Sequence, residues 1–169
     1  MDQLNKIIFL DFDGVLIPKL FSAFGAQMAK ISRGEVNNKD EYGEFFSPAS
    51  VYNLRLLLDE TNASIVFTSN WRKPRSEGGI GYTALREMWL MRFDFGHIKG
   101  ATSVLDPATH KRGDEIALWL KENPADKYLI LDDMGPSMFL PEQLPHLVAC
   151  PEEYGFTNSA LKKAYDILA

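Results

Sequence analysis

Three short apolar runs in this chain of 169 residues each end at polar side chains, and this pattern limits the possible folds more than any other feature. The runs cover residues 6–10, 64–67 and 128–131 (KIIFL, SIVF and YLIL). Short, continuous apolar runs are typical of strands that are buried on both faces of a parallel sheet. We therefore predict core strands in these three runs and a fourth strand at residues 146–150 (HLVAC).

Helical patterns separate the predicted strands. Apolar residues with helical spacing predict a helix that opens at Ser47-Pro48 and ends near Glu60. Three more helices are centred on residues 85–89, 116–120 and 161–168. Alternating strands and helices imply right-handed crossovers. The expected fold class is therefore α/β, a three-layer sandwich with a central parallel sheet of the Rossmann-like type.

The length favours one domain over residues 1–169. The least regular part, residues 14–46, holds scattered glycines and a helical pattern at Leu20, Phe21, Phe24 and Met28. Segments below about 40 residues rarely hold a core of their own, so we expect a flap or small lid here rather than a second domain.

Charge is distributed unevenly along the chain. Lys and Arg number 18 against 23 Asp and Glu, a formal net charge of −5, which gives no global basic surface for nucleic acid or an anionic membrane. Residues 71–112, however, hold 8 basic and 4 acidic side chains, and the remainder holds 10 and 19. This basic middle third is either a set of solvated helix faces or a contact for a negatively charged partner.

No apolar stretch approaches the ~20 residues of a membrane helix, and the first residues (MDQLNK) do not resemble a secretory signal. We therefore expect no membrane contact and a cytoplasmic location. The single cysteine, Cys150, cannot form an internal disulfide and ends an apolar run, so packing is its expected role.

The polar residues at the three strand ends are of specific kinds. They are Asp11-Phe12-Asp13-Gly14, Thr68-Ser69-Asn70 and Asp132-Asp133. Because parallel strands end at the same edge of a sheet, four carboxylates and two hydroxyls should converge on one crevice. Such a concentration of negative charge is costly without a cation. Mg²⁺ is the expected cation because it takes oxygen ligands, whereas one cysteine and three scattered histidines argue against zinc.

Two simpler interpretations of the first motif fit less well. A calcium-binding loop needs Gly at its sixth position and Glu at its twelfth, where this chain has Leu16 and Ser22. A plain turn after the strand accounts for Asp13-Gly14 but not for an ionisable Asp11 at the end of an apolar strand.

In their order along the chain, these residues resemble the four motifs of the haloacid dehalogenase superfamily of aspartyl phosphotransferases. The matching residues are Asp11-Phe12-Asp13-Gly14-Val15, then Thr68, then a cation at Lys111 or Arg112, then Leu131-Asp132-Asp133. More narrowly, the runs IVFTSNWR, RGDEIALWL and ILDD resemble the phosphatase domains of "Swiss Army Knife" RNA-repair proteins and their stand-alone relatives. Receiver domains share the ingredients, but their phosphate-accepting aspartate lies on a later strand.

The resemblance implies a role for each motif residue. Asp11 would attack phosphorus and form an aspartyl phosphate, while Asp13 would protonate the leaving oxygen and then deprotonate the attacking water. Mg²⁺ would be bound within the set Asp11, Asp13 (through its backbone carbonyl), Asp132 and Asp133. Asp133 is favoured as the ligand of the acidic pair, with Asp132 paired to the motif-three cation. Thr68 would donate its hydroxyl to a phosphoryl oxygen.

Two neighbouring residues compete for the role of motif-three cation. Lysine is the superfamily's usual residue, and Lys111 is slightly favoured on that ground. Arg112 aligns better with the RGDEI run of the narrower family. Arginine would hold a phosphate through two parallel hydrogen bonds, and lysine as a point charge.

The intervals between the motifs leave no room for a full cap domain, so the site should be open. An open site suits a large substrate such as a polynucleotide end or a phosphoprotein, or else needs a partner as its lid. Ser69, Asn70, Trp71 and Arg72 are expected to bind the substrate, with Trp71 stacking on a base and Arg72 close to a phosphate. The equally weighted alternative is that Trp71 packs in the core and Arg72 pairs with a local acid.

The sequence thus predicts a Mg²⁺-dependent phosphomonoester hydrolase acting through an aspartyl phosphate, with a phosphorylated nucleotide or polynucleotide end as the leading substrate. The alternatives are a capless phosphatase for a small phosphometabolite or a phosphoprotein, and a non-catalytic binding module of the same fold. The intact set of Asp11, Asp13, Thr68 and Asp133 argues against the binding module.

Overall fold

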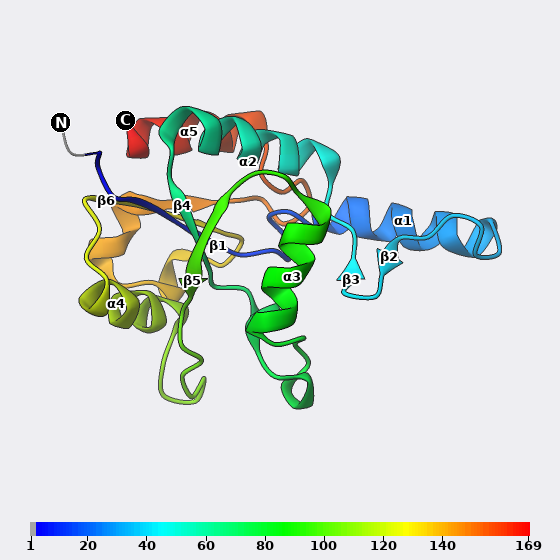
Figure 1. Cartoon of the computed structure of the whole chain (residues 1–169), viewed down its shortest axis with the longest axis horizontal. Helices are drawn as coiled ribbons and strands as arrows, with labels where there is room; N and C mark the ends of the chain where they lie inside the picture. The colour runs from blue at the N-terminus through cyan, green and yellow to red at the C-terminus, as the bar shows by residue number, and fades with distance from the viewer. Residues whose placement is uncertain (1–2) are drawn as a thin grey trace.

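A five-stranded sheet, parallel throughout, forms the centre of the protein (Figure 1). The computed structural model describes residues 3–169. The strands are, in spatial order, β5 (His97–Ala101), β4 (Ser64–Phe67), β1 (Lys6–Leu10), β6 (Lys127–Asp132) and β7 (Leu147–Ala149). β1 is the central strand, since Phe9 pairs with Val66 on one side and with Ile130 on the other. The predicted α/β class is confirmed.

Burial explains which strands the sequence reveals. Residues 7–10 of β1 are fully buried, because helices cover both faces of the sheet. β5 is not among the predicted strands, because its sequence HIKGA includes Lys99 and Gly100 and is only partly buried. An edge strand needs no continuous apolar run, since only one of its sides is paired.

Helices on both faces of the sheet give the three expected layers. The four main helices are α2 (Pro48–Thr61), α3 (Tyr82–Arg92), α4 (Arg112–Glu122) and α5 (Asn158–Leu168). In Figure 1, α2 and α5 lie side by side over one face, and α4 lies against the other. Successive side chains of a strand point to opposite faces. Ile8 therefore packs with α2 and α5, while Phe9 packs with α4.

Short 3₁₀ turns occupy the loops after two of the strands. The loop after β4 contains η1 (Asn70–Arg72) and η2 (Arg75–Glu77), and the segment after β6 contains η3 (Pro136–Met138) and η4 (Pro141–His146). Within residues 3–169, no helix is both long and apolar enough to cross a membrane.

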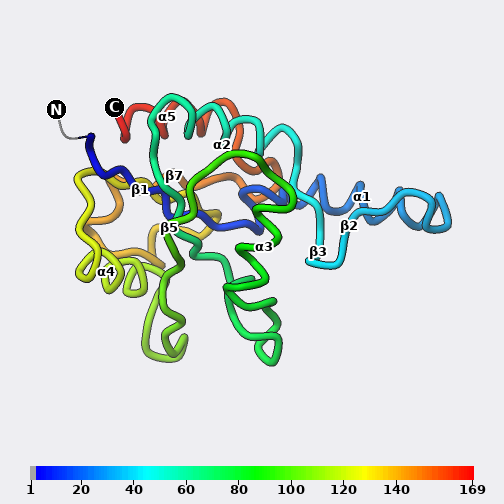
Figure 2. Tube along the Cα trace, in the orientation of Figure 1, coloured from blue at the N-terminus to red at the C-terminus, as the bar shows by residue number. Residues whose placement is uncertain are grey.

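The segment between β1 and α2 has a buried part and a projecting part. Residues 15–17 and Phe46 are buried in the core. Between them, α1 (Lys19–Ile31) and a hairpin of β2 (Lys39–Asp40) and β3 (Gly43–Glu44) project from the body, as both ribbon and trace show (Figures 1 and 2). No residue of α1 is buried, and the described chain contains no full cap domain.

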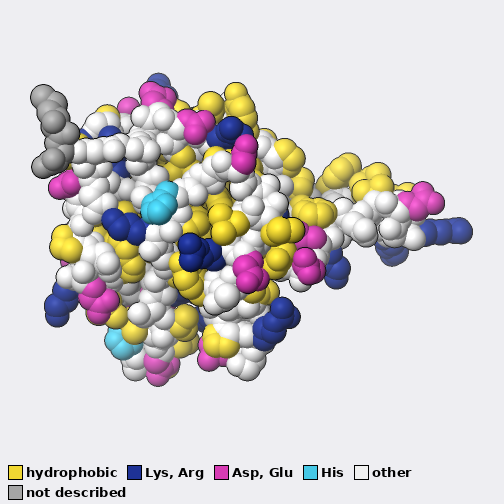
Figure 3. Space-filling model, in the orientation of Figure 1, with side chains coloured by type: hydrophobic (Ala, Val, Ile, Leu, Met, Phe, Trp, Pro, Cys, Tyr) yellow, Lys and Arg dark blue, Asp and Glu magenta, His cyan; other side chains and the backbone are white. Residues whose placement is uncertain are grey.

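Arg92 of α3 fastens this projecting arm, residues 18–45, to the body. Its guanidinium donates to both carboxylate oxygens of Asp40, at 2.6 and 2.9 Å. It also donates to the carbonyls of Gly43, at 3.0 Å, and Glu44, at 2.9 Å. The arm is therefore held through its hairpin, while apolar side chains remain exposed along it (Figure 3).

An aromatic cluster fills the core beneath the arm. Trp89 is fully buried and lies 5.7 Å, between ring centroids, from Phe67 and 4.8 Å from Phe93. Phe12 and Phe46 extend the same cluster toward the arm. The packing role expected of Cys150 also holds, since its side chain is buried in the same core.

Replacing Trp89 by alanine should cost about 3–5 kcal/mol of unfolding free energy, because a large buried ring leaves a cavity that the core only partly refills. The measurement is urea unfolding followed by circular dichroism. Met91→Ala is the matched control, because Met91 lies on the same helix but is 72% exposed, and it should cost about 0.5 kcal/mol or less. Equal unfolding midpoints for the two variants would contradict the core placement of Trp89.

Candidate active site

The carboxyl ends of β1, β4 and β6 bring the motif residues to one edge of the sheet. Asp11 directly follows β1, Thr68 directly follows β4, and Asp132 ends β6. The strand pairing continues into these residues, because the Asp11 N–H donates to the Leu131 carbonyl at 3.0 Å and the Thr68 N–H donates to the Leu10 carbonyl at 3.0 Å. The convergence expected of parallel strands therefore extends to the polar residues that follow them.

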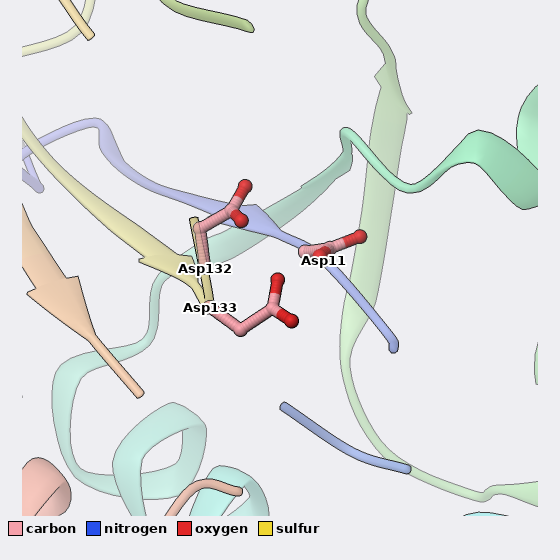
Figure 4. Close-up of side chains that lie close together, drawn as sticks. All are labelled: Asp11, Asp132 and Asp133. Carbon is pink, nitrogen blue, oxygen red and sulfur yellow. The ribbon is translucent and has the colours of Figure 1, made fainter. Parts of the chain in front are cut away.

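Three carboxylates meet at this edge (Figure 4). One oxygen each from Asp11, Asp132 and Asp133 can be chosen so that all three lie within 4.8 Å of one another. Asp11 is 5% exposed and Asp132 is 0% exposed, whereas Asp133 is half-buried. Asp13 is exposed, and its carboxylate is not a member of this group.

Without a cation this cluster is electrostatically unfavourable. Burial raises the pKa of Asp11 well above its ordinary value, and the neighbouring Asp132 raises it further, against the opposing effect of Arg112. Burial raises the pKa of Asp132 as well, again opposed by Arg112. Carboxylates this close and this dry favour either protonation or a bound cation. Because Mg²⁺ prefers oxygen ligands, the donor set fits that metal.

Arg112, rather than Lys111, is the cation of the cluster. Its Nη1 lies 3.0 Å from Asp132 Oδ2 and 3.6 Å from Asp11 Oδ1, and its side chain is 3% exposed. Burial opposes its charge, but these two carboxylates outweigh that effect and raise the pKa of Arg112. Lys111 is exposed, and its backbone N–H donates to Asp114 Oδ2 at 2.7 Å at the start of α4. The preference for Lys111 is therefore corrected.

A glycine next to Arg112 allows α4 to begin against the chain that follows β6. A Cβ on Gly113 would lie 2.8 Å from the Phe139 Cα and 2.9 Å from the Leu140 nitrogen. The Gly113 carbonyl accepts a hydrogen bond from Gln143 Nε2 at 2.8 Å. Close backbone approach thus fixes where α4 starts and where Arg112 enters the cluster.

Two threonine hydroxyls near this edge are buried without a hydrogen-bond partner. Thr68 is 0% exposed and Thr102, directly after β5, is 3% exposed, and neither Oγ1 has a partner in the described chain. A buried hydroxyl left unpaired costs about 1–3 kcal/mol. The Thr68 hydroxyl, which follows the strand next to Asp11, is therefore available to a ligand. Thr102 is not a sequence-predicted site residue, because the strand that carries it is not predicted either.

Asp13 lies on the turn after β1, and its carboxylate is not one of the three that meet at the edge of the sheet. Although its side chain is exposed, the surrounding atoms remove part of its hydration and raise its pKa, as do Glu44 and Asp133. A side-chain hydrogen bond with Trp71 acts in the opposite direction. Gly14 follows with φ of +75°, and a Cβ there would lie 2.3 Å from Asp133 Oδ2. Only glycine lets this turn pass so close to Asp133.

Arg72 does not reach the substrate side of the site. Its side chain is 2% exposed, and all five N–H donors of its guanidinium are used. They bond to the carbonyls of Thr68, Ser69, Thr102 and Ser103 and to the carboxylate of Glu115. The substrate contact expected for Arg72 is therefore corrected to a structural role, because no donor remains for a phosphate.

The other three residues predicted to bind the substrate, Ser69, Asn70 and Trp71, differ in accessibility. Ser69 is fully buried, and its hydroxyl oxygen accepts a hydrogen bond from the Trp71 N–H at 3.2 Å. Asn70 is exposed. Trp71 is half-buried, and its ring packs edge-on against Phe12 and Phe46, at 5.6 and 5.9 Å between centroids. Packing therefore occupies much of the Trp71 surface that base stacking would need.

Glu115 is a site residue that the sequence alone does not single out. It pairs with Arg72, accepts from the Leu105 N–H at 3.3 Å, and lies 4.0 Å from the Arg112 Nε. Its position three residues after Arg112 is the signal available in the RGDEI run. One carboxylate thus joins the loops after β4 and β5 to the first turn of α4.

Part of the basic middle third is internal. Three of its eight cations do not face solvent, because their own side chains are less than a tenth exposed and form ion pairs. These are Arg72, Arg92 and Arg112. A hollow of about 600 Å³ at the amino ends of the strands, near Lys6, Ser64 and His97, contains none of the site residues. Size alone therefore does not locate the site.

Comparison with known proteins supports the resemblance seen in the sequence. The family described as "HAD domain in Swiss Army Knife RNA repair proteins" matches residues 7–161, a span that includes the strand-end motifs and all of α4. No curated protein and no solved structure matches the chain significantly. Because the match covers most of the chain, this protein belongs to the family of HAD domains found in Swiss Army Knife RNA repair proteins.

Proposed function

We propose that this chain is a Mg²⁺-dependent phosphomonoester hydrolase that acts through an aspartyl phosphate on a nucleotide or polynucleotide end. The observation that carries the proposal is the position of Arg112 Nη1, which lies 3.6 Å from Asp11 Oδ1 and 3.0 Å from Asp132 Oδ2. Members of this domain family are generally hydrolases of the phosphatase type. The description of the family connects it with RNA repair, which favours the nucleic-acid substrate.

Asp11, Asp133 and the backbone carbonyl of Asp13 would hold Mg²⁺, and Asp132, paired with Arg112, would lie beside it. The metal supplies positive charge that offsets the repulsion between these carboxylates and an incoming phosphate. The raised pKa values of Asp11 and Asp132 support this assignment, because burial and the neighbouring carboxylates disfavour the ionised forms that a bound cation would stabilise.

In the first step, Asp11 attacks phosphorus in line with the leaving oxygen. A bond forms between the carboxylate and phosphorus as the bond to the leaving oxygen breaks. Arg112 stabilises the ionised form of Asp11 and helps to orient it. The Thr68 hydroxyl, buried without a protein partner, donates to a phosphoryl oxygen and stabilises the charge that develops there.

Asp13 moves the protons in both steps. Its raised pKa favours the protonated form that a general acid needs, and in the first step it donates this proton to the leaving oxygen. In the second step it takes a proton from the water that attacks phosphorus. The bond between Asp11 and phosphorus then breaks, which releases inorganic phosphate and restores the Asp11 carboxylate.

The leaving group would lie in a groove of about 450 Å³ between the arm and the loop after β4. Tyr42, Glu44 and Trp71 are among its lining residues, and the last two also influence the pKa of Asp13. Because a general acid must reach the leaving oxygen, the group released at Asp13 enters this groove. Its volume is in the range of small-ligand pockets and gives room for a nucleoside.

Asp11→Asn should abolish turnover of p-nitrophenyl phosphate in Mg²⁺, because an amide cannot act as the nucleophile. Asp13→Asn should lower kcat by about 10²–10⁴-fold through loss of the general acid. The control is Asp166→Asn, an exposed carboxylate on α5, which should retain the wild-type rate. Rates are measured with Mg²⁺ and with EDTA. Equal rates for wild type and Asp11→Asn would contradict the nucleophile assignment and leave a non-catalytic binding module as the better function.

The metal-free protein should lose stability as pH rises, relative to Asp11→Asn. The folded-state pKa of Asp11 is raised above its ordinary value of 3.8, so the folded state keeps a proton that the unfolded state releases. The stability due to this proton is present below the ordinary pKa and is lost as pH rises toward the folded-state value. In EDTA, the melting temperature of Asp11→Asn should therefore exceed that of wild type by several degrees near neutral pH and by little near pH ~4.

Adding Mg²⁺ should have the opposite effect on the stability of the wild-type protein. Added metal should raise the melting temperature of wild type near neutral pH and have a much smaller effect on Asp11→Asn, because binding to the folded state alone stabilises it. Scanning calorimetry across this pH range measures both effects. A difference between the proteins that does not depend on pH or on Mg²⁺ would contradict the placement of a metal at Asp11.

Substrate class is tested with an oligonucleotide carrying a terminal 3′- or 5′-phosphate. Its hydrolysis should exceed that of small sugar phosphates in kcat/KM and should fall as salt is added, because contacts to neighbouring phosphates release counterions. The same salt series with p-nitrophenyl phosphate serves as the control. Salt-insensitive activity confined to small sugar phosphates would favour a phosphatase for a small phosphometabolite. Activity confined to phosphoproteins would favour a phosphoprotein phosphatase.

A further inference from the structure

A third hollow, about 110 Å³ in volume, lies beside Arg112 and shares no lining residue with the groove proposed for the leaving group. We call it the Lys73 cavity. The loops after β4, β5 and β6 and the first turn of α4 form its walls. Its polar lining residues are Asn70, Lys73, His110, Lys111, Arg112 and Glu115. Because Arg112 also contacts Asp11, the cavity adjoins the reaction centre directly.

The charges of the lining are predominantly positive. Lys73, Lys111 and Arg112 are opposed by one carboxylate, that of Glu115. Glu115 is already engaged by Arg72, by Arg112 at 4.0 Å and by the Leu105 N–H at 3.3 Å. This carboxylate is therefore committed to holding the loops together.

Two further acids on the same segment are also committed, to backbone groups. Asp106 accepts from the Ala108 N–H at 2.9 Å, and Asp114 accepts from the Lys111 N–H at 2.7 Å. Neither carboxylate makes an ion pair with a cavity lysine in the described chain. The positive charge of the cavity is thus not neutralised by the loop that carries Lys111.

The two lysines of the cavity differ from the three buried arginines of the basic middle third. Arg72, Arg92 and Arg112 each bind a carboxylate, but within residues 3–169 neither the Lys73 nor the Lys111 ammonium makes an ion pair or a hydrogen bond. Lys73 is half-buried, and Lys111 is exposed at the rim. Two lysines line one small cavity together with the exposed Asn70, and the N–H groups of ammonium and amide side chains are donors suited to an oxyanion.

We propose that the Lys73 cavity binds a second phosphate group of the substrate while Asp11 and Arg112 act on the first. This assignment rests on the proposed phosphomonoesterase function and specifies its substrate as one that carries two phosphate groups close together. The second group is either the phosphodiester next to a polynucleotide end or the second monoester of a nucleoside bisphosphate. Because a phosphomonoester carries a single organic group, this second phosphate belongs to the leaving group. The leaving group would therefore extend from its groove to the Lys73 cavity across the loop after β4, since residues of that loop line both. Lys111 then has a role in binding even though Arg112 holds the nucleophile.

The test compares three substrates that carry no second phosphate, a second monoester or a phosphodiester. They are a nucleoside monophosphate, the nucleoside 3′,5′-bisphosphate, and a dinucleotide with one phosphodiester and one terminal phosphate, each with the scissile phosphate at either end. Wild type should prefer the substrates with two phosphates in kcat/KM. In the double variant Lys73→Ala, Lys111→Ala, this preference should fall about tenfold or more, as expected when contacts to a phosphate are removed.

Matched variants separate charge from structure. Replacing the same two lysines by arginine should keep the preference, because the positive charges remain. Lys121→Ala removes an exposed cation from the far end of α4 and should leave the preference at its wild-type value. A preference for only one of the two doubly phosphorylated substrates, lost in the double variant, supports the cavity and identifies the source of the second phosphate.

A binding measurement keeps the outcome independent of turnover. The Asp11→Asn protein, titrated calorimetrically with the same three compounds in Mg²⁺, should bind those with two phosphates more tightly, and the two alanines should remove the difference. Tighter binding without hydrolysis by wild type would contradict the proposed function but support the cavity. Equal binding of all three compounds, or a preference that survives loss of both lysines, would overturn the cavity assignment.

Discussion

The contact of the Arg112 guanidinium with Asp11 and Asp132 is the interaction on which the rest of the site depends. A buried carboxylate that loses its partner is strongly destabilising, whereas one held by a cation is tolerated. From Arg112 the connection passes to Glu115, then to Arg72, and from Arg72 to the carbonyls of Thr102 and Ser103. Charged and polar groups thus run across the carboxyl ends of β6, β1, β4 and β5 in turn. Four separate loops are positioned by one continuous set of ion pairs and hydrogen bonds.

The same set of charges is balanced for structure but not for the reaction. Arg112 offsets only part of the negative charge of Asp11, Asp132 and Asp133, and the pKa of Asp11 stays raised. If protein cations neutralised all three carboxylates, the site would not need a metal. Such a site would also hold the phosphate product tightly. In the function proposed here, Mg²⁺ would complete this balance, so that binding of metal and binding of substrate would be coupled through Asp11.

The sequence predicts those parts of the fold that depend on burial and periodicity. Runs such as residues 64–67 are unambiguous because both faces of their strands are covered, and the aspartates that follow them stand at ends that a parallel sheet must bring together. β5 escapes prediction because an edge strand can be partly polar. The choice of Arg112 over Lys111 depends on one step of helical rotation at the start of α4, which Gly113 and its contacts set. A count of charges along the chain cannot show that Arg72 and Arg92 are buried, because only the folded structure places them in ion pairs with Glu115 and Asp40.

The attachment of the arm makes it a separate unit of stability. Because no residue of α1 is buried, releasing the arm exposes little apolar surface of that helix. The contacts that must break are the four hydrogen bonds from Arg92, the contacts of Lys19 with Glu152 and the packing of Tyr42 against the core. Opening of this kind requires less free energy than global unfolding. In the proposed function, the arm that forms one wall of the leaving-group groove would open without disturbing the sheet or the three carboxylates. Sequence change in α1 is correspondingly free of the packing constraints that hold the core, which makes the arm the part of this fold best able to adapt to a new leaving group.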